Sequence, residues 1–452
     1  MISELYRIKY ILFIELSLLI LFAVYGLFPF IVLLSAILLS IIIFLVFKNP
    51  VIILYVLFLS ILADSFIPMK NHPLHFSLLS VEFFFAIFFV LSITKFLFNL
   101  DKKIYVPKII SIWVFFLIWS LLIGLFIALD KYRFLTYWKN YLAGFFIFSL
   151  IYYSIEDKIQ LKSVIISLII WGLLLSLIEL KVMLELGGFT VGLVGLFFKK
   201  NLLTLGWGRS NYLAAFFVII IPLSIGYMLY TKSKKLKIFI IFTLIFMSFA
   251  IILTLSRGGI LALILALVIL FARVLKARTF IPFLIVLLII TLIILLNPLT
   301  YVLFNRISSI ETSNSYFSRL NFYVDVWNTF LKHPITGVGF GNLGYYAMFV
   351  LPASDSPSAH NIVLGALGEV GIIGSILYFL VFGLLLKNVY FGFRAEKDES
   401  LKILRWSFFA ALLGGVLHAL VEPTFEGLQF EIIFWSIAGI SSKLYMLKPS
   451  EN

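Results

Sequence analysis

The sequence predicts an all-α, polytopic membrane protein with about 12–14 transmembrane helices. Of the 452 residues, 63% are hydrophobic and 12% are charged. The mean hydropathy of +1.15 lies far from the balance of a soluble domain. Apolar runs of about 20 residues recur, the length that a helix needs to cross a bilayer. The sequence has no cysteine, which excludes disulfides, thiolate metal sites and a cysteine nucleophile.

The expected helices follow the apolar runs. The first run has no small-residue cleavage site and is interpreted as a retained span. We divide the chain into N-terminal helices (1–200), helices around a Ser-Arg-Gly-Gly turn (201–297), a long loop (298–360) and C-terminal helices (361–452). The predicted helices cover residues 10–26, 29–47, 50–63, 77–98, 109–129, 139–154, 163–184, 211–230, 238–255, 259–272, 279–297, 361–391, 403–421 and 431–446.

Basic residues on alternate connections predict the orientation. The positive-inside rule places these connections and both termini in the cytoplasm. Most of the net charge of +14 lies there, so we interpret it as a topology signal and expect no nucleic-acid partner. The connections carry Lys48, Lys102, Lys103, Lys108, Lys158, Lys162, Lys232, Lys234, Lys235, Lys237, Arg273, Lys276, Arg278, Arg394, Lys397, Lys402, Lys443 and Lys448.

Basic residues also fall on the opposite side, where topology disfavours them. Such cations indicate an anionic ligand on the outer face, and the alternative is that long side chains reach lipid phosphates. They are Lys131, Arg133 and Lys139 in one predicted loop, Lys199, Lys200 and Arg209 in the next, Arg257 at a helical turn, and Arg306, Arg319 and Lys332 in the long loop.

Arg257 lies in the segment Leu253-Thr-Leu-Ser-Arg-Gly-Gly259, between two apolar helices. The second of these helices has about 14 apolar residues before Arg273, roughly 21 Å, which is short of a full hydrocarbon core. Arg257 is therefore expected below the outer surface, where a cation costs a few kcal/mol unless it meets an anion. The alternative is an arginine that caps backbone carbonyls.

The long loop is predicted to contain an amphipathic helix at the membrane interface. Caps at Ser313–Ser315, apolar residues at helical spacing over 316–331 and a proline at position 334 define its limits. Its polar face carries Arg319. The glycine-rich segment Gly337–Asn342 follows without a strand-to-helix context, so we interpret it as a turn and not as a phosphate-binding loop.

His360 ends the long loop at the start of a predicted apolar helix. At about 100° per residue, Gly371 lies roughly 20° and Gly374 roughly 40° from His360, so both glycines are expected below the imidazole. Such a smooth stripe suits a lipid chain or a closely packed helix. The helix N-terminus favours a neutral imidazole, the form that a general base needs. The alternative is a histidine that only bonds a loop carbonyl.

Five motifs occur in order between residues 200 and 440. They are Asn211-Tyr-Leu-Ala with Pro222, Leu255-Ser-Arg-Gly-Gly259, Ser318-Arg319 with Trp327, His333-Pro-Ile-Thr-Gly-Val-Gly-Phe-Gly341, and His360-Asn361 followed by Gly371 and Gly374. Together they resemble the O-antigen ligase family. The region before about residue 190 is similar to that family only as a series of spans.

The resemblance implies a multi-pass glycosyltransferase of the bacterial inner membrane, with a GT-C-like arrangement. Ligases of this family move a glycan from undecaprenyl pyrophosphate to a terminal sugar of lipid A-core on the periplasmic side. Their functional residues are two arginines and a histidine, which by motif are Arg257, Arg319 and His360. We also expect substrate contacts from Arg133, Arg209, Asn211, Asn361, Gly371 and Gly374. Membrane lipids are expected as further partners.

The residue types suit this chemistry. A guanidinium group can bond two oxygens of a leaving pyrophosphate, and imidazole can take the proton of an acceptor hydroxyl at neutral pH. Glu369 cannot orient His360 from the same helix, because it lies about 180° round and roughly 13 Å away. We expect no cofactor and no metal, because the outer-face carboxylates are scattered at Asp64, Asp130, Glu311, Asp325, Asp355, Glu422 and Glu426.

Three functions remain in competition. The first is a ligase, which the spacing of His360, Gly371 and Gly374 favours. The second is a polysaccharide polymerase, whose acceptor is another lipid-linked repeat. The third is a transporter or lipid flippase, which would need polar groups through the full depth of the bilayer. The cations cluster at the outer ends of the predicted spans, which disfavours transport.

Overall fold

The computed structural model describes residues 52, 55, 58, 106–155, 157–187, 203–205, 207, 209–276, 313–350 and 360–446. Between residues 313 and 350 the side chains are described only over 321–346, and in the last segment only up to residue 444. These residues contain helices and no strand, so the all-α prediction is confirmed. The predicted spans 10–26, 29–47, 77–98 and 279–297 lie outside the described residues, as does most of 50–63.

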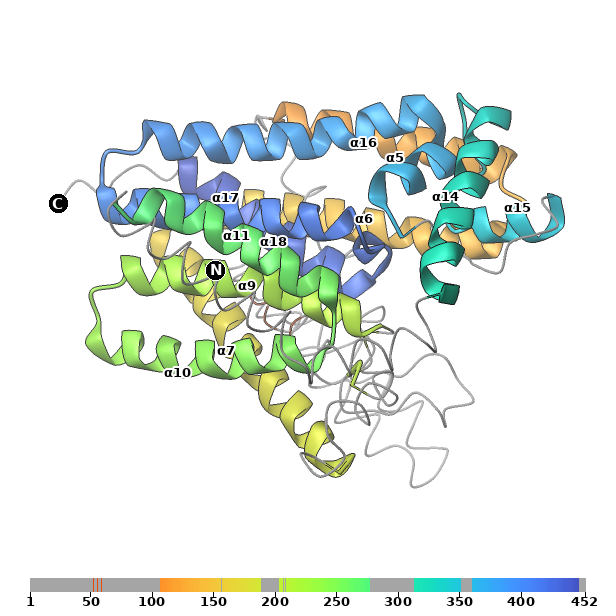
Figure 1. Cartoon of the computed structure of the whole chain (residues 1–452). Coiled ribbons are helices and arrows are strands. Elements are labelled where there is room, and N and C mark those ends of the chain that lie inside the picture. Colours follow the sequence, from red (N-terminus) through yellow and green to blue (C-terminus); the bar gives the residue numbers. More distant parts are fainter. Residues whose placement is uncertain are drawn as a thin grey trace, which may run out of the picture.

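The described helices follow the predicted order (Figure 1). Seven of them, α5, α7, α9, α10, α11, α16 and α17, are long and apolar enough to cross a membrane. The helices are α5 (Lys108–Phe126), α6 (Lys131–Ser154), α7 (Lys158–Glu185), α9 (Ser210–Tyr230), α10 (Lys234–Leu253), α11 (Arg257–Val274), α14 (Ser313–Lys332), α15 (Leu343–Val350), α16 (Ile362–Ala395), α17 (Glu399–Ala419) and α18 (Leu428–Met446), with a 3-10 turn η4 (Thr424–Glu426).

Several of these helices begin after a short polar residue. Its side chain accepts a hydrogen bond from a backbone N–H group that has no partner in the first turn. The Asp130 carboxylate accepts from Arg133 N at 2.8 Å, and α6 therefore begins at Lys131. The prediction that Lys131, Arg133 and Lys139 lie in a loop is wrong, because all three lie on α6.

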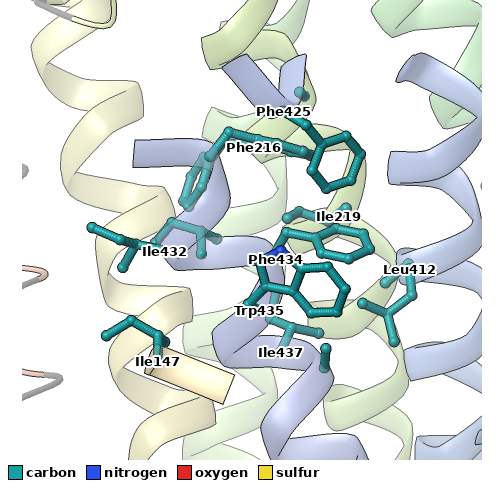
Figure 2. Close-up of a cluster of buried hydrophobic side chains, with 14 of the residues drawn as sticks. Ile147, Phe216, Ile219, Leu412, Phe425, Ile432, Phe434, Trp435 and Ile437 are labelled. Carbon is teal, nitrogen blue, oxygen red and sulfur yellow. The ribbon is translucent and has the colours of Figure 1, made fainter. Parts of the chain in front are cut away.

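The core lies where α9, α17, α18 and α6 meet. Almost every residue of α9 is buried, as expected of a helix that has protein on all sides. Figure 2 shows the aromatic part of this core, in which Trp435 and Phe434 of α18 lie beside Phe216 of α9 and Phe425 of η4. The centroids of the Phe425 and Phe434 rings are 4.9 Å apart, edge to face. This packing fixes η4 against the bundle.

Helix α14 crosses the end of the bundle at which α16 begins (Figure 1). Phe322, Val326 and Thr329 form its buried face, and α14 packs against α16. Val324 and Trp327 are exposed on the other side. The predicted helix in the long loop is confirmed, with its end at Lys332 just before the proline. We call this the α14 end, and it also carries the connections 127–130, 254–256 and 420–427.

Helix α16 breaks at Gly371, whose φ of 64° and ψ of −171° are not helical. The segment after α14 occupies the break, because Ile372 N donates to the Pro334 carbonyl at 2.8 Å and Gly339 N donates to the Glu369 carbonyl at 2.7 Å. The predicted stripe of Gly371 and Gly374 below His360 is therefore wrong, because it assumed one continuous helix. The glycine-rich segment is a turn, as predicted.

We predict that Gly371→Ala lowers the thermal unfolding temperature of the purified protein. A Cβ at this position would overlap the Ile335 carbonyl, and the left-handed backbone alone costs roughly 1–2 kcal/mol for a residue with a side chain. The control is Gly383→Ala in the same helix, where nothing lies within 4 Å of the added Cβ. Equal unfolding temperatures for the two variants in detergent would show that the break needs no glycine.

Candidate functional site

His360 lies at the α14 end, directly before the cap of α16, and its φ is 46°. This left-handed backbone is uncommon for a residue with a side chain and is typical of strained functional positions. Its Nδ1 lies 3.3 Å from Glu422 Oε2. The side chain of His360 is 20% exposed, and that of Glu422 is 7% exposed. The pair therefore has its acid inside the protein and its imidazole at the surface.

The carboxylate determines what the imidazole can do. When Nδ1–H donates to Glu422, the neutral ring has Nε2 as its proton acceptor. Glu422 is the orienting partner that the sequence analysis did not identify. The two residues are 62 positions apart in the chain, and no local spacing links them.

Asn361 caps α16 and connects it to α17. Its Oδ1 accepts from Val363 N at 2.8 Å and from Leu364 N at 3.0 Å, while its Nδ2 donates to the Leu420 carbonyl at 2.9 Å. The segment that carries His360 is thus tied to the segment that carries Glu422. Asparagine is a common cap, so this role could have been predicted from the sequence.

The Arg257 turn packs against the end of α17 and the residues that follow it. Ser256 Oγ accepts from Gly259 N at 3.1 Å and caps α11, which begins at Arg257. Arg257 is exposed. A Cβ on Gly258 would lie 2.8 Å from Val421 Cγ2 and 3.8 Å from His418 Nε2. His418 is fully buried, and its ring nitrogens have no hydrogen-bond partner among the described residues. The structure thus brings the Arg257 turn next to the segment that carries Glu422.

Arg209 lies at the start of α9, with its guanidinium carbon 5.9 Å from the centre of the Tyr212 ring. Its Nη1 is buried, and no partner for it exists among the described residues. A Cβ on Gly427, the residue after η4, would lie 2.9 Å from Tyr212 Cδ2. Arg209, which contacts the Tyr212 ring, therefore lies close to η4. Asn211 is half-buried on the first turn of α9.

Arg133 approaches the glycine-rich turn from α6. Its guanidinium carbon lies 6.0 Å from the centre of the Tyr137 ring, and a Cβ on Gly341 would meet that ring at 2.6 Å. The turn is held to the start of α6 by Asn342, whose Oδ1 accepts from Asp130 N at 2.8 Å and whose Nδ2 donates to the Asp130 carbonyl at 3.1 Å. Arg133 thus lies on the α6 side of the α14 end.

Three predicted site residues lie away from His360 or beyond what is described. Arg319 is on α14, with its side chain outside the described residues. Gly371 forms the helix break, and a Cβ on Gly374 would lie 3.0 Å from Trp119 Cδ1. Both glycines are buried within the protein, and neither lines the cleft that opens beside His360.

This cleft has a cavity volume of about 30 Å³ and opens to solvent. Its walls come from α6, the glycine-rich turn, the first turns of α16 and the segment 419–426. Glu369 and Glu426 line it, close to the Glu422 that pairs with His360. No group of three His, Asp or Glu side chains that could hold a metal ion occurs among the described residues.

The fold and the site together define a multi-pass helical membrane protein with an acid-paired histidine at one end of its bundle. Residues 242–379 match the family model described as O-Antigen ligase, the family that the motifs resemble. The match includes the Arg257 turn, α14 and His360 but not Glu422. The match supports a membrane enzyme of the ligase or polymerase type. No curated protein matches the chain.

We predict that Asn361→Ala destabilises the protein by about 0.5–2 kcal/mol, the usual cost of losing a helix cap. Asn361→Asp keeps the cap but loses the donor to Leu420, so its destabilisation is smaller. Chemical unfolding in detergent measures both. The sequence-based hypothesis that Asn361 contacts substrate predicts a different result, in which substrate affinity falls and stability does not.

Proposed function

We propose that the protein transfers a glycan from undecaprenyl pyrophosphate to a terminal sugar of lipid A-core, at the periplasmic face of a bacterial inner membrane and without a metal ion. The observation that carries this proposal is the contact between His360 Nδ1 and Glu422 Oε2, 3.3 Å long, beside a cleft. It supports His360 as the general base and Glu422 as the residue that positions it.

In the proposed reaction the acceptor oxygen forms a bond to the anomeric carbon of the donor. The bond from that carbon to the pyrophosphate oxygen breaks, and the pyrophosphate leaves with the electron pair. The acceptor proton moves to Nε2 of His360. The Glu422 carboxylate stabilises the resulting imidazolium, as a carboxylate does in the Ser-His-Asp arrangement.

The negative charge of the leaving pyrophosphate grows as the bond breaks, and arginines stabilise it best because their planar groups bond two oxygens. Arg257 is the first candidate, since its turn packs against the segment that carries Glu422. Arg319 is the second candidate by motif. The buried Nη1 of Arg209 supports a further contact to an anion on the same side.

A reconstitution separates this proposal from its alternatives. Purified lipid-linked glycan is supplied with lipid A-core in one vesicle preparation and with a second lipid-linked repeat in another, both in EDTA. Sugar gained by lipid A-core supports the ligase, and sugar gained by the repeat identifies a polymerase. If neither acceptor gains sugar while the lipid crosses the bilayer, the protein is a transporter.

We predict that His360→Ala lowers turnover by roughly 10²–10⁴-fold, the usual contribution of a general base, and leaves donor affinity nearly unchanged. Turnover of the unmodified protein should fall on acidification, because a protonated imidazole cannot accept a proton. Initial rates and donor binding in detergent measure these effects. Folded His360→Ala protein that transfers glycan at the normal rate would contradict the assignment.

The companion variant, Glu422→Gln, tests the positioning role. Removing the carboxylate destabilises the imidazolium, so the acidic limb of the pH–rate profile should move to lower pH while turnover falls. A purely structural role for Glu422 would lower the amount of folded protein and leave the pH profile of the remainder in place.

We predict that the Arg257→Lys variant does not retain normal function. An ammonium group is a point charge and cannot bond two phosphate oxygens in the planar geometry of guanidinium. Donor affinity and turnover should both fall. The matched control is Arg273→Lys at the other end of α11, whose guanidinium carbon lies 5.4 Å from the centre of the Phe393 ring. Near-normal activity in both variants would show that only the charge of Arg257 matters.

A further inference from the structure

The end of the bundle opposite the α14 end carries the connection between α16 and α17 and the last turn of α11 (Figure 1). There the guanidinium carbon of Arg273 lies 5.4 Å from the centre of the Phe393 ring, and Lys402 Nζ lies 5.9 Å from the same centre. Three helices contribute, because Arg273 is on α11, Phe393 on α16 and Lys402 on α17. Each cation is close enough to be attracted to the ring. The two like charges repel each other, and an anion between them would remove that repulsion.

The acidic side chains between α16 and α17 are held by other groups or lie in solvent. Glu396 accepts from Arg405 Nε at 3.0 Å, and Asp398 accepts from the first backbone N–H groups of α17. Glu399 lies 3.2 Å from Lys402 Nζ, but its side chain is 79% exposed. An ion pair at such an exposed position contributes little to stability. The surroundings of the ring that the two cations share therefore stay positive.

A partly exposed stripe of α17 begins at Lys402. Its members recur every three or four residues, which is the spacing of one helix face. Most other positions of α17 after Leu404 are buried. We call this stripe the α17 face, and it consists of Lys402, Trp406, Phe409, Leu413, Val416 and Leu420. The α17 face is thus basic at one end and apolar along the rest of its length.

Helices α11 and α16 flank the α17 face. Both pack on α17, and they have few direct contacts with each other. Trp406 lies between them, because its Nε1 donates to the Ile269 carbonyl of α11 at 2.8 Å and its ring centre is 4.7 Å from that of Phe393 on α16. Further along α17, the ring centres of Phe409 and Tyr390 of α16 are 5.9 Å apart. The apolar surface between the two helices therefore leads to the two cations.

This arrangement matches the two parts of an anionic phospholipid. Basic sites between transmembrane helices bind anionic headgroups, and aromatic side chains are enriched at the level of the headgroups. Basic residues that only orient a membrane protein need neither a shared ring nor an adjoining apolar face. The positive-inside rule therefore explains why cations lie at this end but not why these two lie together at the end of the α17 face.

We propose that an anionic phospholipid binds here, with its phosphate between Arg273 and Lys402 and one acyl chain along the α17 face. The site lies at the opposite end of the bundle from His360 and does not depend on the proposed transfer reaction. The headgroup needs a positive charge and not the planar geometry of guanidinium, so Arg273→Lys retains the site.

The first test measures lipid binding by native mass spectrometry of the full chain in a neutral detergent. Dioleoyl phosphatidylglycerol is the anionic probe, and dioleoyl phosphatidylcholine has the same chains with a headgroup of no net charge. The first phosphatidylglycerol should bind more tightly than phosphatidylcholine. The double variant Arg273→Gln/Lys402→Gln should weaken it by roughly thirtyfold, the factor that corresponds to two basic groups near an anionic lipid surface.

The matched control is Lys162→Gln/Lys443→Gln, which removes the same charge from the same end of the bundle. Lys162 Nζ lies 5.7 Å from the centre of the Tyr230 ring, and Lys443 Nζ lies 5.9 Å from that of Tyr152, so each meets a ring of its own. This variant should bind phosphatidylglycerol nearly normally. Equal losses in the two double variants, or equal affinity of the unmodified protein for the two lipids, would overturn the proposal.

The second test concerns the acyl chain. Leu413→Trp places a larger side chain on the α17 face and leaves both cations in place, so it should weaken phosphatidylglycerol. Glycerol 3-phosphate, which has the phosphate without the chains, should not displace the lipid at equal concentration. Unchanged lipid binding in a Leu413→Trp protein with a normal unfolding temperature, or displacement by glycerol 3-phosphate, would overturn the proposal. Undecaprenyl phosphate that binds more tightly than phosphatidylglycerol would assign the α17 face to the polyprenyl donor and overturn it as well.

Discussion

Backbone hydrogen bonds between the segment after α14 and the broken turn of α16 determine the direction in which α16 begins. Ile372 N reaches the Pro334 carbonyl, and Gly339 N reaches the Glu369 carbonyl. These bonds replace the helical ones that are lost at Gly371. Because α16 turns at this point, its first residues can hold His360 over the cleft while its remaining turns stay in the bundle. The same segment supplies Gly341 N to the side chain of Glu369.

Acidic side chains at the α14 end have different surroundings and therefore different expected tasks. The Glu422 side chain is 7% exposed and contacts an imidazole, which can become a cation. Glu369 is 8% exposed and contacts a backbone N–H group. A carboxylate beside a basic group favours proton transfer, whereas one that is held by the backbone suits the binding of hydroxyls.

Much of the helical order could be predicted from the sequence, because a membrane span needs only a long apolar run. The predicted first and last residues of the helices were less accurate. The cap at Asp130 starts α6 earlier than hydropathy indicated, since the first turn of α6 is polar. The glycine stripe failed for a different reason, because a periodic pattern cannot reveal a backbone with positive φ at Gly371. The pairing of His360 with Glu422 is a tertiary contact, and no property of either residue's neighbours predicts it.

The contacts that complete the site join distant parts of the chain. Asn140 and Glu426 are separated by 286 positions, and Asp130 and Asn342 by 212. Synthesis proceeds from the N-terminus, so residues near Asn140 enter the membrane long before their partners exist. Until α17 and the segment after it have been made, Asn140 has no Glu426 carbonyl to bond and His360 has no carboxylate. The geometry of the site is thus completed only after the segment that follows α17 has been synthesised, and a nascent chain without that segment has a histidine without its acid.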